Sequence, residues 1–163
     1  MKNKNTAIII LAAGKSTRMK SDIPKVLHHI CGRPILSYAL DLAGDLKVDK
    51  VIAVLGHKQE EVKRIINPGI KVVIQKRLLG TADAVKVALP SLGNFKGTIL
   101  ILYADNPLLK KETINKLLKF HVENNSDVTL LTAKTDRPYG YGRILRDKYA
   151  TICGIVEETD AQD

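Results

Sequence analysis

A small-residue loop near the N-terminus, followed by two cations, carries the residue types that phosphate chemistry requires. Leu11-Ala12-Ala13-Gly14 leaves an apolar run of isoleucines, and Arg18 and Lys25 follow it. Backbone amides of such a loop can approach a nucleotide closely, while an Arg or Lys side chain meets the phosphate charges. We therefore predict a nucleotide-binding loop here, with the rest of the chain as its scaffold and its other walls.

The tripeptide Gly14-Lys15-Ser16 copies the end of the Walker phosphate-binding pattern, but the rest of that pattern is missing. A Walker sequence requires a glycine five positions before Gly14, and Ile9 stands there, inside the predicted strand. The dinucleotide fingerprint also fails, because its second and third glycines are absent. These spacings argue against a P-loop kinase and against an NAD-binding protein.

The elements that must position the loop alternate between strand and helix. Strands are expected at residues 6–11, 50–55, 70–75, 97–103 and 127–133. Helices are expected from Pro34 to near Gly44, around residues 61–66, from about 81 to 89, and around 114–121. Two short runs, 143–145 and 151–156, predict a hairpin. The pattern predicts an α/β protein with a doubly wound, mostly parallel sheet, Rossmann-like, and a C-terminal β-hairpin.

Two polar residues stand where predicted strands end. Gln75 closes one apolar run, and Asp105 follows the clearest strand of the chain. Ligands of doubly wound sheets bind beyond the carboxyl ends of the strands, so Gly14, Gln75 and Asp105 are expected to share one site. Each has a plainer interpretation: Gln75 as a solvated strand end, and Asp105 as the cap of the helix that follows.

Composition narrows the class of protein. With 163 residues, 45% of them apolar, one domain with a sizeable core is expected. The net charge of +9 raises nucleic acid, membrane surfaces or anionic small molecules as partners. The lysines are scattered and aromatics make up only 4%, which argues against base stacking and favours a phosphate-handling enzyme.

Compartment is indicated by the cysteines and by the apolar run 7–13. Cys31 and Cys153 have no zinc-type spacing and form no disulfide framework, so we expect reduced, buried thiols in a cytoplasmic protein. The run 7–13 follows two lysines, as in a signal peptide, but passes directly into the loop and is better explained as a buried strand. No stretch is long enough to cross a membrane.

Five blocks of residues, in order along the chain, resemble the signature of sugar-nucleotide nucleotidyltransferases. The resemblance narrows to the N-terminal uridylyltransferase domain of bacterial bifunctional GlmU, the family of UDP-N-acetylglucosamine pyrophosphorylase and glucosamine-1-phosphate N-acetyltransferase. The blocks are Leu11–Gly14 with Thr17-Arg18-Met19, Pro24–His28 with Gly32-Arg33-Pro34, Gln75 with Leu79–Ala82, Tyr103–Asp105 with Pro107-Leu108, and Gly140–Ile144 with Gly154–Glu157. The first block indicates only the superfamily, whereas PKVLH, LGTA and GYGRI together are quite specific.

The resemblance implies a role for each residue at the phosphates. Leu11, Ala12, Ala13 and Gly14 would contact the uridine nucleotide through backbone groups. Arg18 would meet the departing pyrophosphate and Lys25 the phosphates at the reacting centre, and these two are the catalytic candidates. Asp105 would bind Mg²⁺, a hard ion that takes one or two protein carboxylates and keeps several waters.

The resemblance also implies contacts for the base and for the acceptor sugar. Gln75, Gly80 and Thr81 would hold uracil, and Tyr103 is assigned to the same substrate site. Gly142 and Glu157 would contact the N-acetylglucosamine part of the acceptor, although a hairpin carboxylate is more often surface charge.

The implied reaction is Mg²⁺-dependent uridylyl transfer from UTP to N-acetylglucosamine 1-phosphate, giving UDP-N-acetylglucosamine and pyrophosphate. Its product serves peptidoglycan and lipopolysaccharide synthesis in the cytoplasm. The acceptor is already an anion, so the reaction needs positioning and charge neutralisation rather than a general base. The resemblance then implies that the protein binds these two substrates and that it binds neither nucleic acid nor a membrane.

The chain departs from the family pattern at three residues and in length. Ser16 stands where Gly is frequent, Asp83 follows LGTA where His is common, and Asn106 lies beside the predicted metal ligand. In the family, the domain continues past the position of Asp163 with further acceptor contacts and an Asn that shares the metal. A β-helix acetyltransferase domain follows and builds the trimer. We therefore expect a truncated piece with low activity, monomeric or weakly associated.

Two alternatives remain. One is a nucleotidyltransferase for another nucleotide or another sugar phosphate. The other is a non-catalytic module that binds nucleotides or nucleic acid, which the net charge of +9 suggests.

Overall fold

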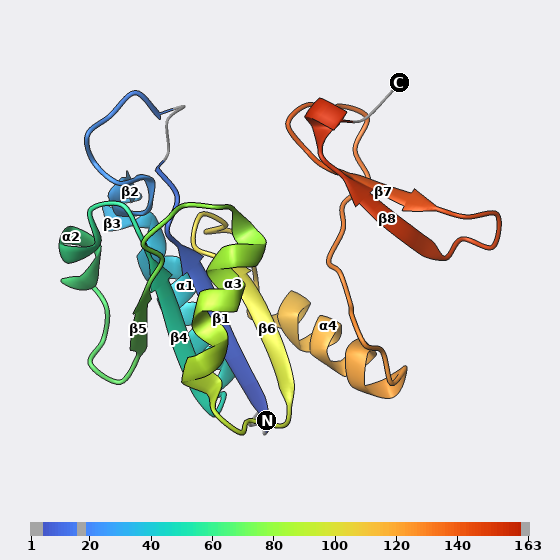
Figure 1. Cartoon of the computed structure of the whole chain (residues 1–163), viewed down its shortest axis with the longest axis horizontal. Coiled ribbons are helices and arrows are strands. Elements are labelled where there is room, and N and C mark those ends of the chain that lie inside the picture. Colours follow the sequence, from blue (N-terminus) through green and yellow to red (C-terminus); the bar gives the residue numbers. More distant parts are fainter. Residues whose placement is uncertain (1–4, 16–18, 161–163) are drawn as a thin grey trace. The chain divides into compact units, whose positions relative to one another are not determined.

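The computed structural model describes residues 5–15 and 19–160, apart from the side chain of Thr159. Within it the chain forms two compact units, Met1–Thr129 and Leu130–Asp163. The first unit holds a parallel sheet with helices, and the second holds a short hairpin (Figure 1).

The sheet of the first unit has four parallel strands. They are β1 (Thr6–Ala12), β4 (Lys50–Leu55), β5 (Lys71–Ile74) and β6 (Thr98–Tyr103), in the order β5-β4-β1-β6. Three isoleucines of β1, Ile8 to Ile10, are 0% exposed, as expected for a continuously apolar strand covered on both faces. The chain leaves β1 toward β4 and later returns to its other side as β6, so the strand order reverses at β1.

Helices cover both faces of this sheet. Ile8 and Ile10 pack in one core with α1 (Ile35–Leu46), α2 (Gln59–Lys63) and α4 (Lys111–Glu123). Ala7 and Ile9, which point the other way, pack in a second core with α3 (Thr81–Ala88) and the 3₁₀ turn η3 (Leu89–Leu92). The predicted doubly wound α/β fold is confirmed (Figure 1).

Helix α1 ends at Leu46, two residues after Gly44, near which the sequence predicted its end. It runs on through Gly44 to Leu46, and the chain then turns at Lys47, whose φ is 50°. Leu46 is 0% exposed, so burying it in the core outweighs the weak helix propensity of one glycine. Pro34 lies just before the helix rather than in it, because it pairs with His29 in a small antiparallel ladder.

That ladder joins β2 (His29–Ile30) and β3 (Arg33–Pro34) and places one cysteine in a tight turn. Cys31 and Gly32 between the strands have φ of 50° and 78°, a two-residue hairpin geometry. Cys31 is exposed there, and Cys153 is exposed in the second unit. The prediction that both thiols are buried was therefore wrong, since Cys31 lies in the turn of one two-stranded ladder and Cys153 in a strand of another.

The second unit contains the predicted hairpin. Its strands are β7 (Arg143–Arg146) and β8 (Ile152–Val156), paired antiparallel with Arg143 opposite Val156, and a turn η4 (Glu158–Asp160) follows. This confirms the hairpin that the two short apolar runs predicted.

The strand predicted at residues 127–133 was wrong. The structure has no strand over those residues, and Val128 and Leu131 are 75% and 54% exposed. Strand-forming side chains need a partner strand and a covering layer, and the described residues offer this segment neither.

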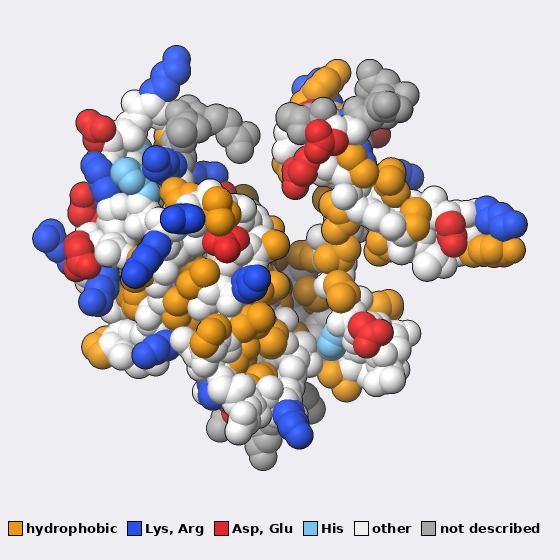
Figure 2. Space-filling model, in the orientation of Figure 1, with side chains coloured by type: hydrophobic (Ala, Val, Ile, Leu, Met, Phe, Trp, Pro, Cys, Tyr) orange, Lys and Arg blue, Asp and Glu red, His pale blue; other side chains and the backbone are white. Residues whose placement is uncertain are grey.

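The described surface agrees with the scattered charge of the sequence. Figure 2 shows Lys and Arg side chains spread among neutral, acidic and hydrophobic ones on the visible face of the first unit. No helix among residues 5–15 and 19–160 has the length and apolar character to cross a membrane.

Candidate functional site

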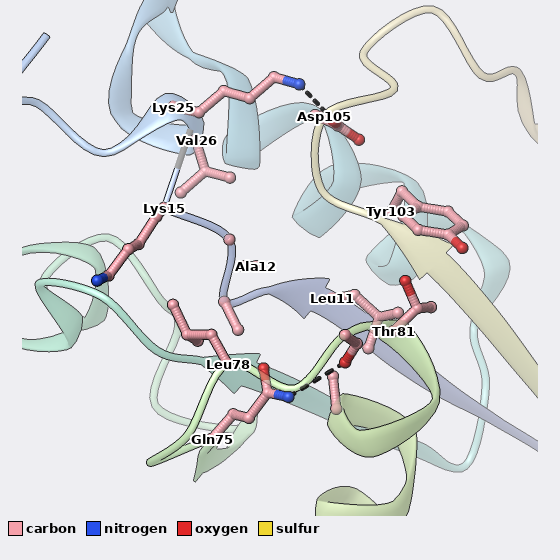
Figure 3. A pocket seen from close by; sticks show the side chains of 14 residues that line it. Leu11, Ala12, Lys15, Lys25, Val26, Gln75, Leu78, Thr81, Tyr103 and Asp105 are labelled. Atoms are coloured by element: carbon pink, nitrogen blue, oxygen red, sulfur yellow. Dashed lines mark hydrogen bonds and ion pairs between the residues drawn. The ribbon is translucent and has the colours of Figure 1, made fainter. Parts of the chain in front are cut away.

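A pocket of about 440 Å³ opens beyond the carboxyl ends of β1, β5 and β6, where the strand order reverses (Figure 3). This is the position in which doubly wound sheets bind their ligands. Its lining consists of Leu11, Ala12, Ala13, Gly14, Lys15, Lys25, Val26, Gln75, Leu78, Gly80, Thr81, Ala84, Tyr103 and Asp105.

Most of the predicted site residues therefore meet in one pocket. The lining includes the predicted residues Leu11–Gly14, Lys25, Gln75, Gly80, Thr81, Tyr103 and Asp105. Arg18 lies outside the described residues, so its assignment stays a prediction. Gly142 and Glu157 belong to the second unit, and their acceptor contacts stay predictions as well.

An ion pair spans one end of the pocket. Lys25 Nζ lies 2.6 Å from Asp105 Oδ2, and the side chains are 38% and 34% exposed. Lys25 begins the 3₁₀ turn η2 (Lys25–Leu27), whereas Asp105 follows β6. Ala104, 1% exposed, donates its backbone N–H to Leu11 O at 3.1 Å, which ties the end of β6 to the end of β1. The pair thus joins a cation and a carboxylate that are 80 residues apart in the sequence. Both line the same pocket as the loop Leu11–Gly14.

Gln75 lies in another wall of the pocket and is only 4% exposed, so it is not the solvated strand end of the plainer interpretation. Its backbone N–H donates to Leu55 O at 2.7 Å. Its side-chain Nε2 donates to Asp83 Oδ2 at 2.7 Å and to Gly80 O at 3.1 Å. Asp83 therefore has a definite function in the structure: it anchors the Gln75 amide.

The turn before α3 needs glycine at one position. Gly80 precedes the helix with φ of 102°, a conformation that other residues adopt only with strain. The turn brings both Gly80 and Thr81 into the pocket lining. In the motif LGTA, Gly80 thus permits the backbone turn, and Gly80 and Thr81 both form part of the pocket wall.

Gly56 supports the pocket and was missed by the sequence analysis. A Cβ on Gly56 would lie 2.6 Å from Ala13 O and 2.7 Å from Leu78 Cδ2, which is closer than real contacts allow. The next residue, His57, donates its backbone N–H to Ala13 O at 3.4 Å. A glycine directly after a buried strand was the available signal, but an ordinary turn gives the same pattern.

Gly14 differs from Gly56 in its surroundings. No heavy atom of the described residues lies within 4 Å of a Cβ built on Gly14, and its φ is outside the left-handed region. Within the part of the chain that the structure describes, neither packing nor backbone conformation requires glycine there, although Gly14 lines the pocket. The remaining physical reason for a glycine is the close approach of a ligand.

The side chains of the pocket offer few ligands for a metal ion. Among the described residues there is no group of three or more His, Cys, Asp or Glu side chains that could hold a metal ion. Asp105 is the single carboxylate among the described lining residues. A Mg²⁺ ion, which accepts one protein carboxylate together with phosphate oxygens and waters, is compatible with this donor set, whereas an all-protein cage is not.

Known proteins of similar sequence include nucleotidyltransferases. The family model described as the MobA-like NTP transferase domain matches residues 8–160. The bifunctional protein GlmU of Alkaliphilus metalliredigens is 47% identical over 152 residues, covering 93% of this chain and 33% of that protein. The bifunctional protein GlmU of Streptococcus gordonii is 42% identical over 155 residues. The chain spans about a third of the length of these relatives, and the resemblance to GlmU is confirmed.

Solved structures share the fold. Rv0371c from Mycobacterium tuberculosis H37Rv aligns with a TM-score of 0.63 at 26% identity, over 73% of this chain and 61% of that one. HddC from Yersinia pseudotuberculosis aligns with a TM-score of 0.61 at 23% identity, over 93% of this chain and 68% of that one. The Rossmann-like architecture inferred from the sequence is confirmed by these likenesses.

Proposed function

The chain belongs to the MobA-like NTP transferase domain family, and from this premise we propose that it forms the nucleotide-binding part of a uridylyltransferase. The proposed reaction transfers a uridylyl group from UTP to N-acetylglucosamine 1-phosphate in the presence of Mg²⁺. Nucleotidyl transfer is supported by the family and by the GlmU relatives. The observation that carries the proposal is that Gln75, Gly14 and the Lys25–Asp105 pair line one pocket.

We assign the two polar walls of the pocket to the two parts of the nucleotide. The buried amide of Gln75 is suited to pair with the imide edge of uracil, beside Gly80 and Thr81. The triphosphate would lie along Gly14 toward Lys25, because backbone amides and an ammonium group are the groups that offset phosphate charge. Leu11 and Tyr103 would contribute apolar contact between these ends.

The proposed reaction needs no general base. An oxygen of the acceptor's phosphate attacks the α-phosphorus of UTP, and a new P–O bond forms as the bond to the bridging oxygen breaks. The electron pair of that bond leaves with pyrophosphate. Since the attacking oxygen is already an anion, the protein must align the reactants and offset charge, and Lys25, which lines the pocket, would do the second.

The metal proposal rests on Asp105. Its carboxylate would hold Mg²⁺ together with phosphate oxygens, and the ion would supply further neutralisation of the phosphates. Lys25 keeps the carboxylate oriented toward the pocket through the 2.6 Å contact. Asn106, the next residue along the chain, is exposed.

A panel of substrates tests the proposal. Pyrophosphate release is measured with UTP, CTP, ATP and GTP against N-acetylglucosamine 1-phosphate and glucose 1-phosphate, with and without Mg²⁺. We expect release with UTP, N-acetylglucosamine 1-phosphate and Mg²⁺. A preference for a purine nucleotide would contradict the uridine assignment, and a preference for another sugar phosphate would contradict the acceptor.

A further inference from the structure

We propose that Asp83 is a positioning residue that fixes which edge of the Gln75 amide faces the nucleotide base, and thereby makes the site prefer uridine over cytidine. The inference rests on the proposed uridylyl transfer, because it concerns the base end of the same pocket. Asp83 does not line the pocket itself and would act only through Gln75.

The hydrogen bonds of Gln75 determine the orientation of its amide. The NH₂ group of the amide carries two hydrogens, and its nitrogen lies 2.7 Å from Asp83 Oδ2 and 3.1 Å from Gly80 O. An ionised carboxylate and a backbone carbonyl are both acceptors only. If the amide turned over, its oxygen would face two other oxygens, so the NH₂ group must be the inner one.

Burial makes this orientation matter. Gln75 is 4% exposed, so water has little access to repair a misdirected amide. Asp83 lies in the first turn of α3, which is fixed by Gly80: the N–H of Ala84 donates to Gly80 O at 3.2 Å. The carboxylate is thus held on a helix, opposite the end of β5, and both elements set the distance between the two side chains.

With its NH₂ group held inward, Gln75 has its carbonyl oxygen left for the pocket. In Figure 3 this oxygen is turned away from the dashed hydrogen bond of the nitrogen. A carbonyl oxygen accepts from the N3–H of uracil, whereas N3 of cytosine carries a lone pair and no hydrogen. Cytosine therefore presents an acceptor to an acceptor, and the site would reject it. Selectivity at N3 then depends on the carboxylate behind Gln75.

A double-mutant cycle tests whether Asp83 acts through Gln75. Dissociation constants of UTP and CTP are measured by NMR titration, with Mg²⁺, for the wild type, Asp83→Ala, Gln75→Met and the double variant. We expect Asp83→Ala to lower the UTP-over-CTP ratio by roughly threefold to tenfold, the partial effect reflecting the remaining contact to Gly80 O. In the Gln75→Met background the same substitution should leave the ratio unchanged.

Two variants serve as controls. Asp83→Asn keeps an acceptor oxygen and should retain most of the preference. Asp45→Ala removes the same charge from an exposed position of α1 outside the pocket lining and should change neither constant. A structural readout accompanies them: the side-chain NH₂ resonances of Gln75 should shift in Asp83→Ala and not in Asp45→Ala.

The outcomes separate the inference from the proposed function. A wild type that prefers CTP or a purine nucleotide contradicts the uridine assignment and the inference with it. A wild type that prefers UTP, together with an unchanged ratio in Asp83→Ala, overturns the inference alone. An equal fall in the ratio in the presence and absence of Gln75 would also overturn it, because the carboxylate would then act by another route.

Discussion

Replacing Asp105 by Asn is expected to lower the rate of Mg²⁺-dependent pyrophosphate release by at least about a hundredfold, the scale of losing one preorganised charge at a reacting centre. Among the described residues that line the pocket, Asp105 is the single carboxylate, so none of the others could take over its charge. Asn keeps the shape and one oxygen but not the negative charge that a hard cation prefers. The measurement is the rate as a function of Mg²⁺ concentration, with UTP and N-acetylglucosamine 1-phosphate.

The fold should survive this substitution. Both partners of the Lys25–Asp105 pair are about a third exposed, and such pairs contribute at most about 1 kcal/mol to the free energy of unfolding. Asp41→Asn is the matched control, because Asp41 forms an exposed ion pair with Arg33 at 2.5 Å, outside the pocket lining. The control should leave the rate unchanged. An undiminished rate for Asp105→Asn would remove Asp105 from the metal role.

Replacing Gly56 by Ala is expected to destabilise the protein by roughly 1–3 kcal/mol, the usual cost of overpacking a well-packed site. The added Cβ would lie 2.6 Å from Ala13 O, so the backbone at the end of β1 would have to move. Urea unfolding measures the loss of free energy. Since Ala13 lines the pocket, affinity for UTP should fall as well.

Gly14→Ala is the matched substitution and should show the opposite pattern. Its Cβ would meet no heavy atom of residues 5–15 and 19–160 within 4 Å, so the free energy of unfolding should change by no more than about 0.5 kcal/mol. Affinity for UTP should fall roughly tenfold or more, because the methyl group would take up space needed for close approach of the nucleotide. Equal unfolding free energies for the two variants would contradict this account of the glycines.

The sheet and most of the pocket could be predicted because their signals are local and strong. The apolar run of β1 and its exit into Gly14 identify a buried parallel strand and the loop after it. The same logic predicted Gln75 and Asp105 at strand ends, and they follow β5 and β6, the two outer strands of the sheet. Parallel strands bring their carboxyl ends to one edge of the sheet, so three separate positions in the sequence became one pocket.

What could not be predicted depends on pairing across the chain. Residues 127–133 have strand-forming side chains but no partner strand among the described residues, and propensity alone does not build a strand. Gly56 differs from an ordinary turn glycine through its close approach to Ala13 and Leu78, which no local pattern reveals. The sequence shows Asp83 as a departure from the family pattern. That it accepts a hydrogen bond from Gln75 could be learned only from the structure.

The central claim is that the pocket at the carboxyl edge of the sheet binds a uridine nucleotide. Its most direct test is a titration of the 163-residue chain with UTP and Mg²⁺, followed in ¹⁵N–¹H NMR spectra. We predict saturable shifts at Gly14, Gly80, Thr81 and the side chain of Gln75, with weaker binding of ATP. Shifts that avoid these residues, or equal shifts with ATP, would contradict the claim.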